Sequence, residues 1–600
     1  MCGFAALAQP GRTFDADMLD GLDAALFHRG PDSGGRVSEP GAALIFRRLA
    51  IMDPTPGSDQ PMTHAGRDVT LVFNGEIYNF RALRQQLEDE GAVFRTSCDT
   101  EVILLGYCHW GEAILDRLEG MFALCLLDRQ EGQMIAARDP LGIKPLYMAR
   151  SGDLTGFASE ARALTPIFGN EPDPQALPEL LTFGWAAGSL SNYRGIERVA
   201  GGTVIKTDLA TGAQTRRRFC DALATLEEPD CSTEADAHDA VIQSLHAHLM
   251  SDVGYGLQLS GGVDSSLIAA LAADASGTKL DSYAVKLDDP AFDEGEYRKP
   301  VIEKYGLEHR DHPVDGKRFA DALPGAVRHM EGPVPHGGCV TLYSMCEDIA
   351  KTHKVVLTGE GADEMFGGYQ RYGIWQKLAR QEQLDRCWPG FLPLPDMWPF
   401  KGVRRLRGRD FAVFASMYEN LAAMGSVFPD LLPVPPGARE AASARFDDFR
   451  DRLFATDQTA YLESLLVRQD KMSMAHSVEA RVPFVHMPLL RVVNALPNTV
   501  RVPGGMTKPV LKRLAERYLP HDLIHRRKVG LTLPYDKWAA DPALLGRYLD
   551  DITDPNGRLR SYADPKRLDA AVDTFRRGER VDRPRMFSLI NMETWLRSIA

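Results

Sequence analysis

Two glycines flanked by hydroxyls and an acid, in Ser260-Gly261-Gly262-Val263-Asp264-Ser265-Ser266, could hold a phosphate. Glycine lets the backbone approach an anion closely. Ser265 and Ser266 can donate hydrogen bonds, and Asp264 can hold magnesium on the phosphates. A strand-like run (253–259) precedes the loop and a helical run (267–271) follows it, so free N–H groups at the helix start would point at the anion. This context favours a nucleotide site over a tight turn between buried elements.

The loop is not a Walker motif, because no Lys follows the glycines. It resembles the S-G-G-x-D-S pyrophosphate loop of the N-type ATP pyrophosphatases. That resemblance implies cleavage between the α and β phosphates, with adenylation of a substrate. The ATP-binding residues that we expect are Leu259, Ser260, Gly261, Gly262, Asp264, Ser265, Ser266, Val285, Thr358 and Gly359.

A second chemical stretch follows a buried, strand-like run: Thr358-Gly359-Glu360-Gly361-Ala362-Asp363-Glu364. In open α/β sheets, ligands bind at the carboxyl ends of the strands. Three carboxylates within five residues would repel one another without a cation. Magnesium pyrophosphate or a substrate amine would relieve that repulsion. A solvated charged loop is the alternative, but the four glycines at 359, 361, 367 and 368 favour close approach to a ligand.

Cys2 directly follows the initiator Met and would become the first residue after Met removal. A terminal Cys carries its own base, since the α-amine has a pKa near ~7.7. Terminal nucleophiles of this kind are activated by the adjacent amine. Alone, an early Cys is more often a buried structural residue, so the interpretation depends on the motifs that follow.

Those motifs are HRGPD (28–32), NGEIYN (74–79) and RDPLGIKPLY (138–147), in that order behind Met-Cys-Gly. Together they resemble the glutaminase domain of class II glutamine amidotransferases, which are N-terminal-nucleophile (Ntn) hydrolases. The resemblance implies that Cys2 attacks the glutamine side-chain amide. It implies an oxyanion hole formed by the Asn74 side chain and the Gly75 N–H.

The same resemblance implies the groups that hold the glutamine backbone. Arg48 would clamp the α-carboxylate, and Glu76 and Asp99 would hold the α-ammonium. The adjacent Arg47 competes with Arg48, which we prefer because it directly precedes Leu-Ala-Ile. Arg29 either couples this site to the ATP site or has a structural role.

Further motifs strengthen the interpretation of the second half: 468–484, around Asp470, Glu479 and Arg481; 507–512; and 527–534. With the two ATP motifs they resemble the synthetase domain of asparagine synthetases. This implies Asp264 and Asp363 on Mg²⁺, Ser260 and Ser266 on phosphates, and Glu360 as the acid that assists ammonia attack. Lys508 would neutralise charge as the adenylate forms and breaks down, with Lys512 and Arg513 as close competitors.

The elements that position these residues require more than one domain, because 600 residues are too many for a single core. The resemblances imply an α/β multidomain protein. Residues 1–215 would form an Ntn-hydrolase αββα sandwich. Residues 230–600 would form an ATP-pyrophosphatase domain (adenine nucleotide alpha hydrolase-like) with a parallel sheet. Pro and Gly are frequent between about 165 and 235, and we place the boundary between about 210 and 235.

Composition restricts the partners. The net charge is −13 and no basic stripe is present, which argues against nucleic acid. No apolar run reaches membrane-spanning length. The nine Cys contain no C-x-x-C pair and the N-terminus lacks a signal peptide, so we expect a cytoplasmic enzyme. A homodimer is retained as a hypothesis.

We therefore expect a glutamine-dependent, ATP-consuming amide synthetase with a dry interdomain channel for ammonia and aspartate as its default acceptor. Three alternatives stay open: another carboxylate, such as a sugar uronic acid or a modified amino acid; a β-lactam-forming relative without glutaminase activity; and a non-catalytic glutamine sensor. The intact Cys2 and NGEIYN motif argue against the second, and both full acid and phosphate sets argue against the third.

The acceptor should lie near residues 331–343, which include His336. Residues 380–460, with a Pro-rich run (388–395) and a basic run (404–409), carry no identifiable chemistry.

Overall fold

A computed structural model describes residues 2–228, 230–289, 293–387, 411, 421–432, 434, 437–526, 533–579 and 583–599. The Pro-rich and basic runs of the 380–460 segment and most of the 527–534 motif lie outside the described residues.

The N-terminal half contains two six-stranded antiparallel sheets. The first has the order β10 (Ile196–Arg198), β8 (Tyr147–Ser151), β9 (Leu154–Ala158), β1 (Gly3–Ala8), β3 (Ala42–Arg48), β2 (Ser33–Glu39). The second has the order β12 (Gln214–Arg218), β11 (Thr203–Asp208), β7 (Gln133–Arg138), β6 (Gly120–Asp128), β5 (Val69–Ile77), β4 (Met62–His64).

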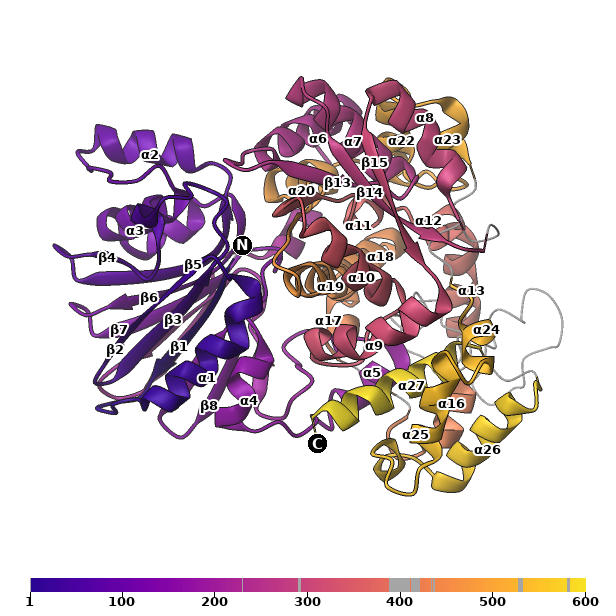
Figure 1. Ribbon diagram of the computed structural model, residues 1–600. Helices are drawn as coiled ribbons and strands as arrows, with labels where there is room; N and C mark the ends of the chain where they lie inside the picture. Colours follow the sequence, from indigo (N-terminus) through magenta and orange to yellow (C-terminus); the bar gives the residue numbers. More distant parts are fainter. Residues whose placement is uncertain are drawn as a thin grey trace.

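The two sheets pack face to face, and helices cover their outer faces (Figure 1). In β1, Phe4 and Ala6 point into the core between the sheets, whereas Ala5 and Leu7 point toward α1 (Ala16–Leu26) and α4 (Ala161–Phe168). Helices α2 (Phe80–Asp89) and α3 (Asp99–Trp110) cover the second sheet. This arrangement confirms the predicted αββα sandwich, and it explains why β1 is apolar at every position.

The C-terminal half is built on a five-stranded parallel sheet, as predicted. Its order is β15 (Glu308–Val314), β14 (Asp281–Leu287), β13 (Tyr255–Gln258), β16 (Val355–Leu357), β17 (Glu479–Arg481). One face packs against α6 (Glu234–His248), α7 (Val263–Ser276), α20 (Met487–Asn494) and α22 (Pro509–Ala515). The other packs against α9 (Gly316–Met330), α10 (Gly338–Ile349) and α19 (Leu462–Met474), with α27 (Arg583–Ser598) beyond them. Parallel sheets are normally covered on both faces in this way.

Further helices complete the described chain: α5 (Leu177–Phe183), α8 (Gly295–Tyr305), α11 (Ala362–Phe366), α12 (Gln370–Gly373), α13 (Trp375–Cys387), α16 (Leu421–Val427), α17 (Ala438–Ser443), α18 (Phe449–Thr456), α21 (Asn498–Arg501), α23 (His521–His525), α24 (Tyr535–Ala540), α25 (Leu549–Thr553) and α26 (Pro565–Arg576). Among the helices of the described ranges, none combines the length and apolarity needed to cross a membrane.

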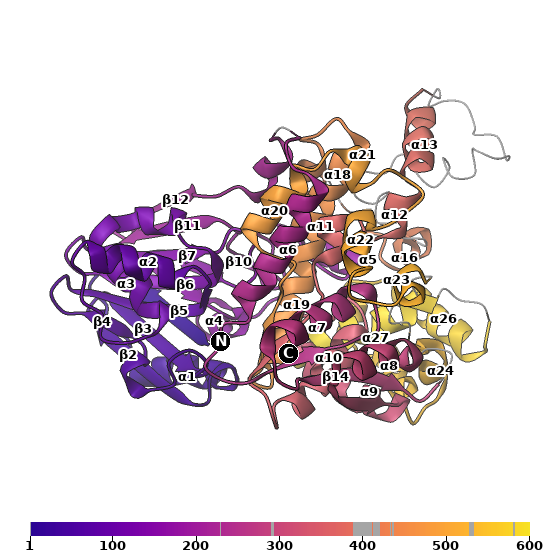
Figure 2. The ribbon, with the colours of Figure 1, turned by 90° about the horizontal axis from the view of Figure 1, so that it is seen from above.

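Apolar side chains of the two halves belong to one buried cluster. The N-terminus lies at the junction of the halves (Figures 1 and 2). Tyr78, Met121 and Ile143 of the N-terminal half pack with Leu257 and Leu259, which lead into the ATP loop. Strand β12 ends at residue 218 and α6 begins at 234. The division at 215 to 230 stays a prediction, since α5, which precedes it, packs in the core of the C-terminal half.

Candidate active sites

Cys2 lies immediately before β1, against the end of β5. Its backbone nitrogen donates to Asn74 Oδ1 at 2.9 Å. The Asn74 side-chain nitrogen is buried and makes no hydrogen bond within the part of the chain that the structure describes. A Cβ at Gly75 would lie 2.0 Å from the Met121 carbonyl oxygen, so only glycine fits. An unused amide donor beside a nucleophile is the arrangement that an oxyanion hole needs.

One small cavity is lined by the predicted glutaminase residues other than Asn74. Its lining includes Cys2, Arg48, Gly75, Glu76 and Asp99. The Arg48 guanidinium donates to Asp59 at 2.8 Å and to three backbone carbonyls between residues 52 and 55. Arg48 thus stands in the cavity wall and also braces the loop beside it.

Arg47, the competitor of Arg48, points elsewhere. It pairs with Asp23 and its guanidinium lies 4.9 Å from the centre of the Phe27 ring. The structure therefore places Arg48, not Arg47, at the cavity.

The cavity favours a cationic ligand group beside its acids. Burial raises the pKa of Asp99 to about 6. The hydrogen bond that its carboxylate accepts from the Ile77 N–H at 2.9 Å acts in the opposite direction and lowers the pKa. Burial and the neighbouring Glu479 raise the pKa of Glu76 well above its ordinary value. An ammonium group would stabilise both carboxylates. Burial also raises the pKa of the Cys2 thiol, so a nearby base must take its proton.

The predicted ATP loop connects β13 to α7. Gly261 has φ +86°, which favours glycine. Ser260 Oγ lies 2.9 Å from Ser265 Oγ, which closes the loop on itself. A Cβ at Gly359 would lie 2.7 Å from the Ser265 nitrogen, so the second motif packs directly on the first. The Ser266 hydroxyl is buried and has no hydrogen-bond partner among the described residues.

The neighbouring strands hold the other predicted ATP residues. Leu259 donates through its N–H to the Tyr283 carbonyl of β14 at 2.8 Å, two residues before Val285. Thr358 donates to the Arg481 carbonyl at 3.0 Å, at the carboxyl end of β16. The predicted ATP-binding residues therefore lie together at the carboxyl ends of the parallel strands.

Lys508 bridges the two carboxylates that we expect to hold magnesium. Its Nζ lies 2.6 Å from Asp264 Oδ2 and 2.7 Å from Asp363 Oδ1. Burial opposes the charge, but these two carboxylates raise the pKa of Lys508 above its ordinary value. A Cβ at Gly368 would lie 2.0 Å from Lys508 Cε, so this glycine leaves room for the lysine. Arg513 pairs with Glu234 instead, which distinguishes it from Lys508.

The same two acids fit a magnesium ion. Within the described ranges, no group of three or more His, Cys, Asp or Glu side chains is arranged as a metal site. Mg²⁺ on a nucleotide, however, takes only one or two carboxylates besides phosphate oxygens. Because a single ammonium contacts both Asp264 and Asp363, the two are close enough to share a cation.

Glu360 belongs to a different contact. Its Oε1 accepts a hydrogen bond from Arg468 Nη2. Arg468 Nη1 lies 3.0 Å from His336 Nε2. The predicted transfer acid and the predicted acceptor segment are therefore joined through one arginine of α19.

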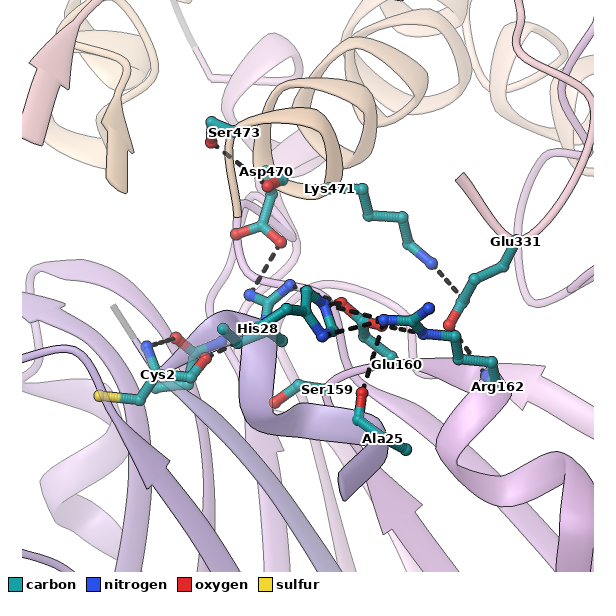
Figure 3. A network of polar contacts seen from close by, with 12 residues as sticks. Cys2, Ala25, His28, Ser159, Glu160, Arg162, Glu331, Asp470, Lys471 and Ser473 are labelled. Carbon is teal, nitrogen blue, oxygen red and sulfur yellow. Dashed lines mark hydrogen bonds and ion pairs between the residues drawn. The ribbon is translucent and has the colours of Figure 1, made fainter. Parts of the chain in front are cut away.

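A buried polar network joins the glutaminase site to helix α19 across the interface (Figure 3). Arg29 Nε donates to the Cys2 carbonyl at 3.1 Å, and Arg29 Nη2 lies 2.9 Å from Asp470 Oδ2. Glu160 contacts Arg29 at 3.1 Å and His28 at 2.8 Å. Asp470 is two residues from Arg468 on α19, so this helix contacts both sites.

Sequence reasoning assigned no role to Arg468, Asp470 or Arg481, although it included them in a motif. Arg481 Nη2 lies 3.2 Å from Glu76 Oε1, across the domain interface. All three side chains are buried. Charges inside an otherwise buried motif could have indicated this role, because buried charges are normally paired.

Two protein-family models match this chain. The model of the glutamine amidotransferase domain matches residues 1–219, and that of asparagine synthase matches residues 236–597. Asparagine synthetase [glutamine-hydrolyzing] 1 of Bacillus subtilis is 30% identical, covering 90% of this chain and 88% of its own. A putative asparagine synthetase [glutamine-hydrolyzing] of Mycobacterium tuberculosis is 32% identical, covering 91% and 89%. Amidase chyE of Penicillium rubens is 25% identical, with 90% of each chain covered.

Proposed function

Since this chain belongs to the asparagine synthase family, we propose that it is a glutamine-dependent asparagine synthetase. Glutamine is hydrolysed at Cys2 and supplies ammonia. Aspartate and ATP form an acyl adenylate and pyrophosphate. Ammonia then displaces AMP, which gives asparagine, glutamate, AMP and pyrophosphate as products.

In the glutaminase half, the Cys2 thiol attacks the side-chain carbonyl of glutamine. The unused Asn74 amide donor and the Gly75 N–H stabilise the oxyanion, and one such donor is typically worth about 10²–10³ in rate. Arg48 holds the α-carboxylate. Glu76 and Asp99 hold the α-ammonium, which is supported by the raised pKa of both acids.

In the ATP half, the Ser260–Ser266 loop binds the phosphates at the start of α7. Asp264 and Asp363 would hold Mg²⁺, which when bound neutralises phosphate charge. Lys508 stabilises the negative charge that develops when the adenylate forms and breaks down. Its position between both acids, with its raised pKa, supports a permanently cationic group there.

Ammonia must travel between the two sites without protonation, because ammonium is not a nucleophile. We propose a dry route along the interface where Tyr78, Met121 and Ile143 meet Leu257 and Leu259. The nine free cysteines support a reducing, cytoplasmic setting. A homodimer remains part of the proposal.

The observation that carries this proposal is that α19 contacts both sites, through Asp470 toward Cys2 and through Arg468 to Glu360. The decisive experiment measures pyrophosphate release with ATP, glutamine and a panel of carboxylates. The panel contains aspartate, glutamate, a sugar uronic acid and a buffer blank. Aspartate should give the highest kcat/KM and asparagine as product. A uronic acid that outperforms aspartate would contradict the choice of acceptor but not the reaction type.

A further inference from the structure

We propose that His336 is a positioning residue for the ammonia-transfer step, holding Arg468 so that Arg468 fixes Glu360. This inference rests on the proposed function and deepens it. His336 lies in the loop between α9 and α10, in the segment where we expect the acceptor. The three residues come from three separate segments of the chain, and they meet at one point.

The direction of the hydrogen bonds follows from the chemistry of arginine. A guanidinium donates only, so His336 Nε2 must accept from Arg468 Nη1 over their 3.0 Å distance. The imidazole proton therefore sits on Nδ1. Burial and the adjacent Arg468 lower the pKa of His336 to about 3, so the ring stays neutral and keeps this lone pair.

The loop that carries His336 is anchored on both sides. Gly337 donates through its N–H to Tyr535 Oη at 3.0 Å, and a Cβ at Gly337 would lie 2.2 Å from the same oxygen. Val334 exchanges two hydrogen bonds with Asn591, at 3.0 and 2.7 Å. The histidine is thus held at a fixed place rather than on a free loop.

Arg468 is buried and divides its donors between the two partners. Nη1 binds His336 and Nη2 binds Glu360, so the imidazole fixes the plane of the guanidinium and the guanidinium fixes one carboxylate oxygen. Without the histidine, Arg468 could rotate about its side chain and the carboxylate would follow. A misplacement of about 1 Å can cost about 10²-fold in rate.

This geometry matters for only one step. In transfer, the ammonia nitrogen forms a bond to the acyl carbon and the carbon–oxygen bond to AMP breaks, with the electron pair leaving on AMP. One proton must leave the attacking nitrogen, and the fixed Glu360 carboxylate receives it. Adenylation requires no such proton acceptor, so a defect at His336 should separate the two steps.

The test compares His336→Leu with His336→Gln, whose side-chain oxygen can accept from Arg468. ATP–pyrophosphate exchange reports adenylation, and amide formation from ammonium reports transfer. We expect His336→Leu to keep exchange and to lose transfer by about 10²-fold, near the lower limit for a positioned proton acceptor. His336→Gln should recover most of that loss.

A matched control is His329→Gln, which alters a partly buried histidine near the end of α9 whose ring contacts His28 and Tyr343. It should leave the ratio of the two steps unchanged. Arg468→Lys tests the contact from the other side, because it keeps the charge but replaces the planar guanidinium, whose two terminal nitrogens bind separate partners, with a single ammonium. Arg468→Lys should also lose transfer selectively. It provides the test if His336→Leu does not fold.

If His336→Leu lost adenylation and transfer equally, or if His336→Gln transferred no better than His336→Leu, this inference would be overturned while the proposed function would stand. A wild-type enzyme that shows no exchange with any carboxylate would instead overturn the proposed function, and this inference with it.

Discussion

Arg29 and Asp470 form an ion pair that connects the glutaminase half to helix α19, with 2.9 Å between Nη2 and Oδ2. Their side chains are 0% and 3% exposed. Because Arg29 also binds the Cys2 carbonyl, the main chain of the nucleophile is held by a group that is paired with a carboxylate of the ATP half. Assembly of one site is therefore tied to the packing of the other domain.

Removing one charge of this pair should be costly. We expect Asp470→Asn to lower the free energy of unfolding by about 3–5 kcal/mol, the usual result of removing one partner of a buried ion pair. Denaturant unfolding of the full chain measures it. The control is Asp20→Asn, whose partner Arg36 lies at 2.6 Å but with side chains 66% and 52% exposed. That change should cost less than about 1 kcal/mol, and equal effects would contradict the argument.

Cys2→Ala should abolish glutamine-supported synthesis while ammonium still supports it, because the ATP half keeps all its residues. Product formation with each nitrogen source measures the two activities. Cys108→Ala, which removes a half-buried thiol on α3, should change neither. If Cys2→Ala stopped both activities, the model of two separate sites would be wrong.

The local parts of both sites could be predicted from sequence. The Gly261-Gly262 pair, with a strand before it and α7 after it, belongs to a phosphate-binding motif that lies within seven consecutive residues. The strand proved shorter than expected, Tyr255–Gln258 rather than 253–259. The Ser251 hydroxyl binds Val253 in a turn, so pairing begins later.

The contacts between segments could not be predicted. His336 and Arg468 are 132 residues apart, and no local periodicity relates them. Glu76 was expected to hold glutamine, yet its Arg481 partner comes from the other domain. Such pairs depend on how two folded halves pack, and a single sequence does not contain that information in any one stretch.

Lys508 should be essential for adenylation. Replacing it with Met removes the cation between Asp264 and Asp363, so those carboxylates would repel each other and the phosphates. We expect pyrophosphate release to fall by about 10²–10³-fold, as for other lost electrostatic groups. Glutaminase activity should remain.

Lys512→Met is the matched control for Lys508, because Lys512 lies four residues further along the chain, on helix α22, and Lys508 directly precedes that helix. Pyrophosphate release by this variant should stay near the wild-type rate. A larger loss for Lys512 than for Lys508 would show that the wrong lysine was assigned.

Asp99 should set the acid limb of glutaminase activity. Its pKa is raised to about 6, chiefly by burial, so its carboxyl takes up a proton as the pH falls through that value. A protonated Asp99 has no charge for the glutamine α-ammonium, and binding weakens. The profile of kcat/KM reports the free enzyme, so kcat/KM for glutamine should decline below about pH 6. Asp99→Asn should lower kcat/KM at neutral pH and remove its decline at low pH. If the decline persisted unchanged in the variant, another group would be responsible for it.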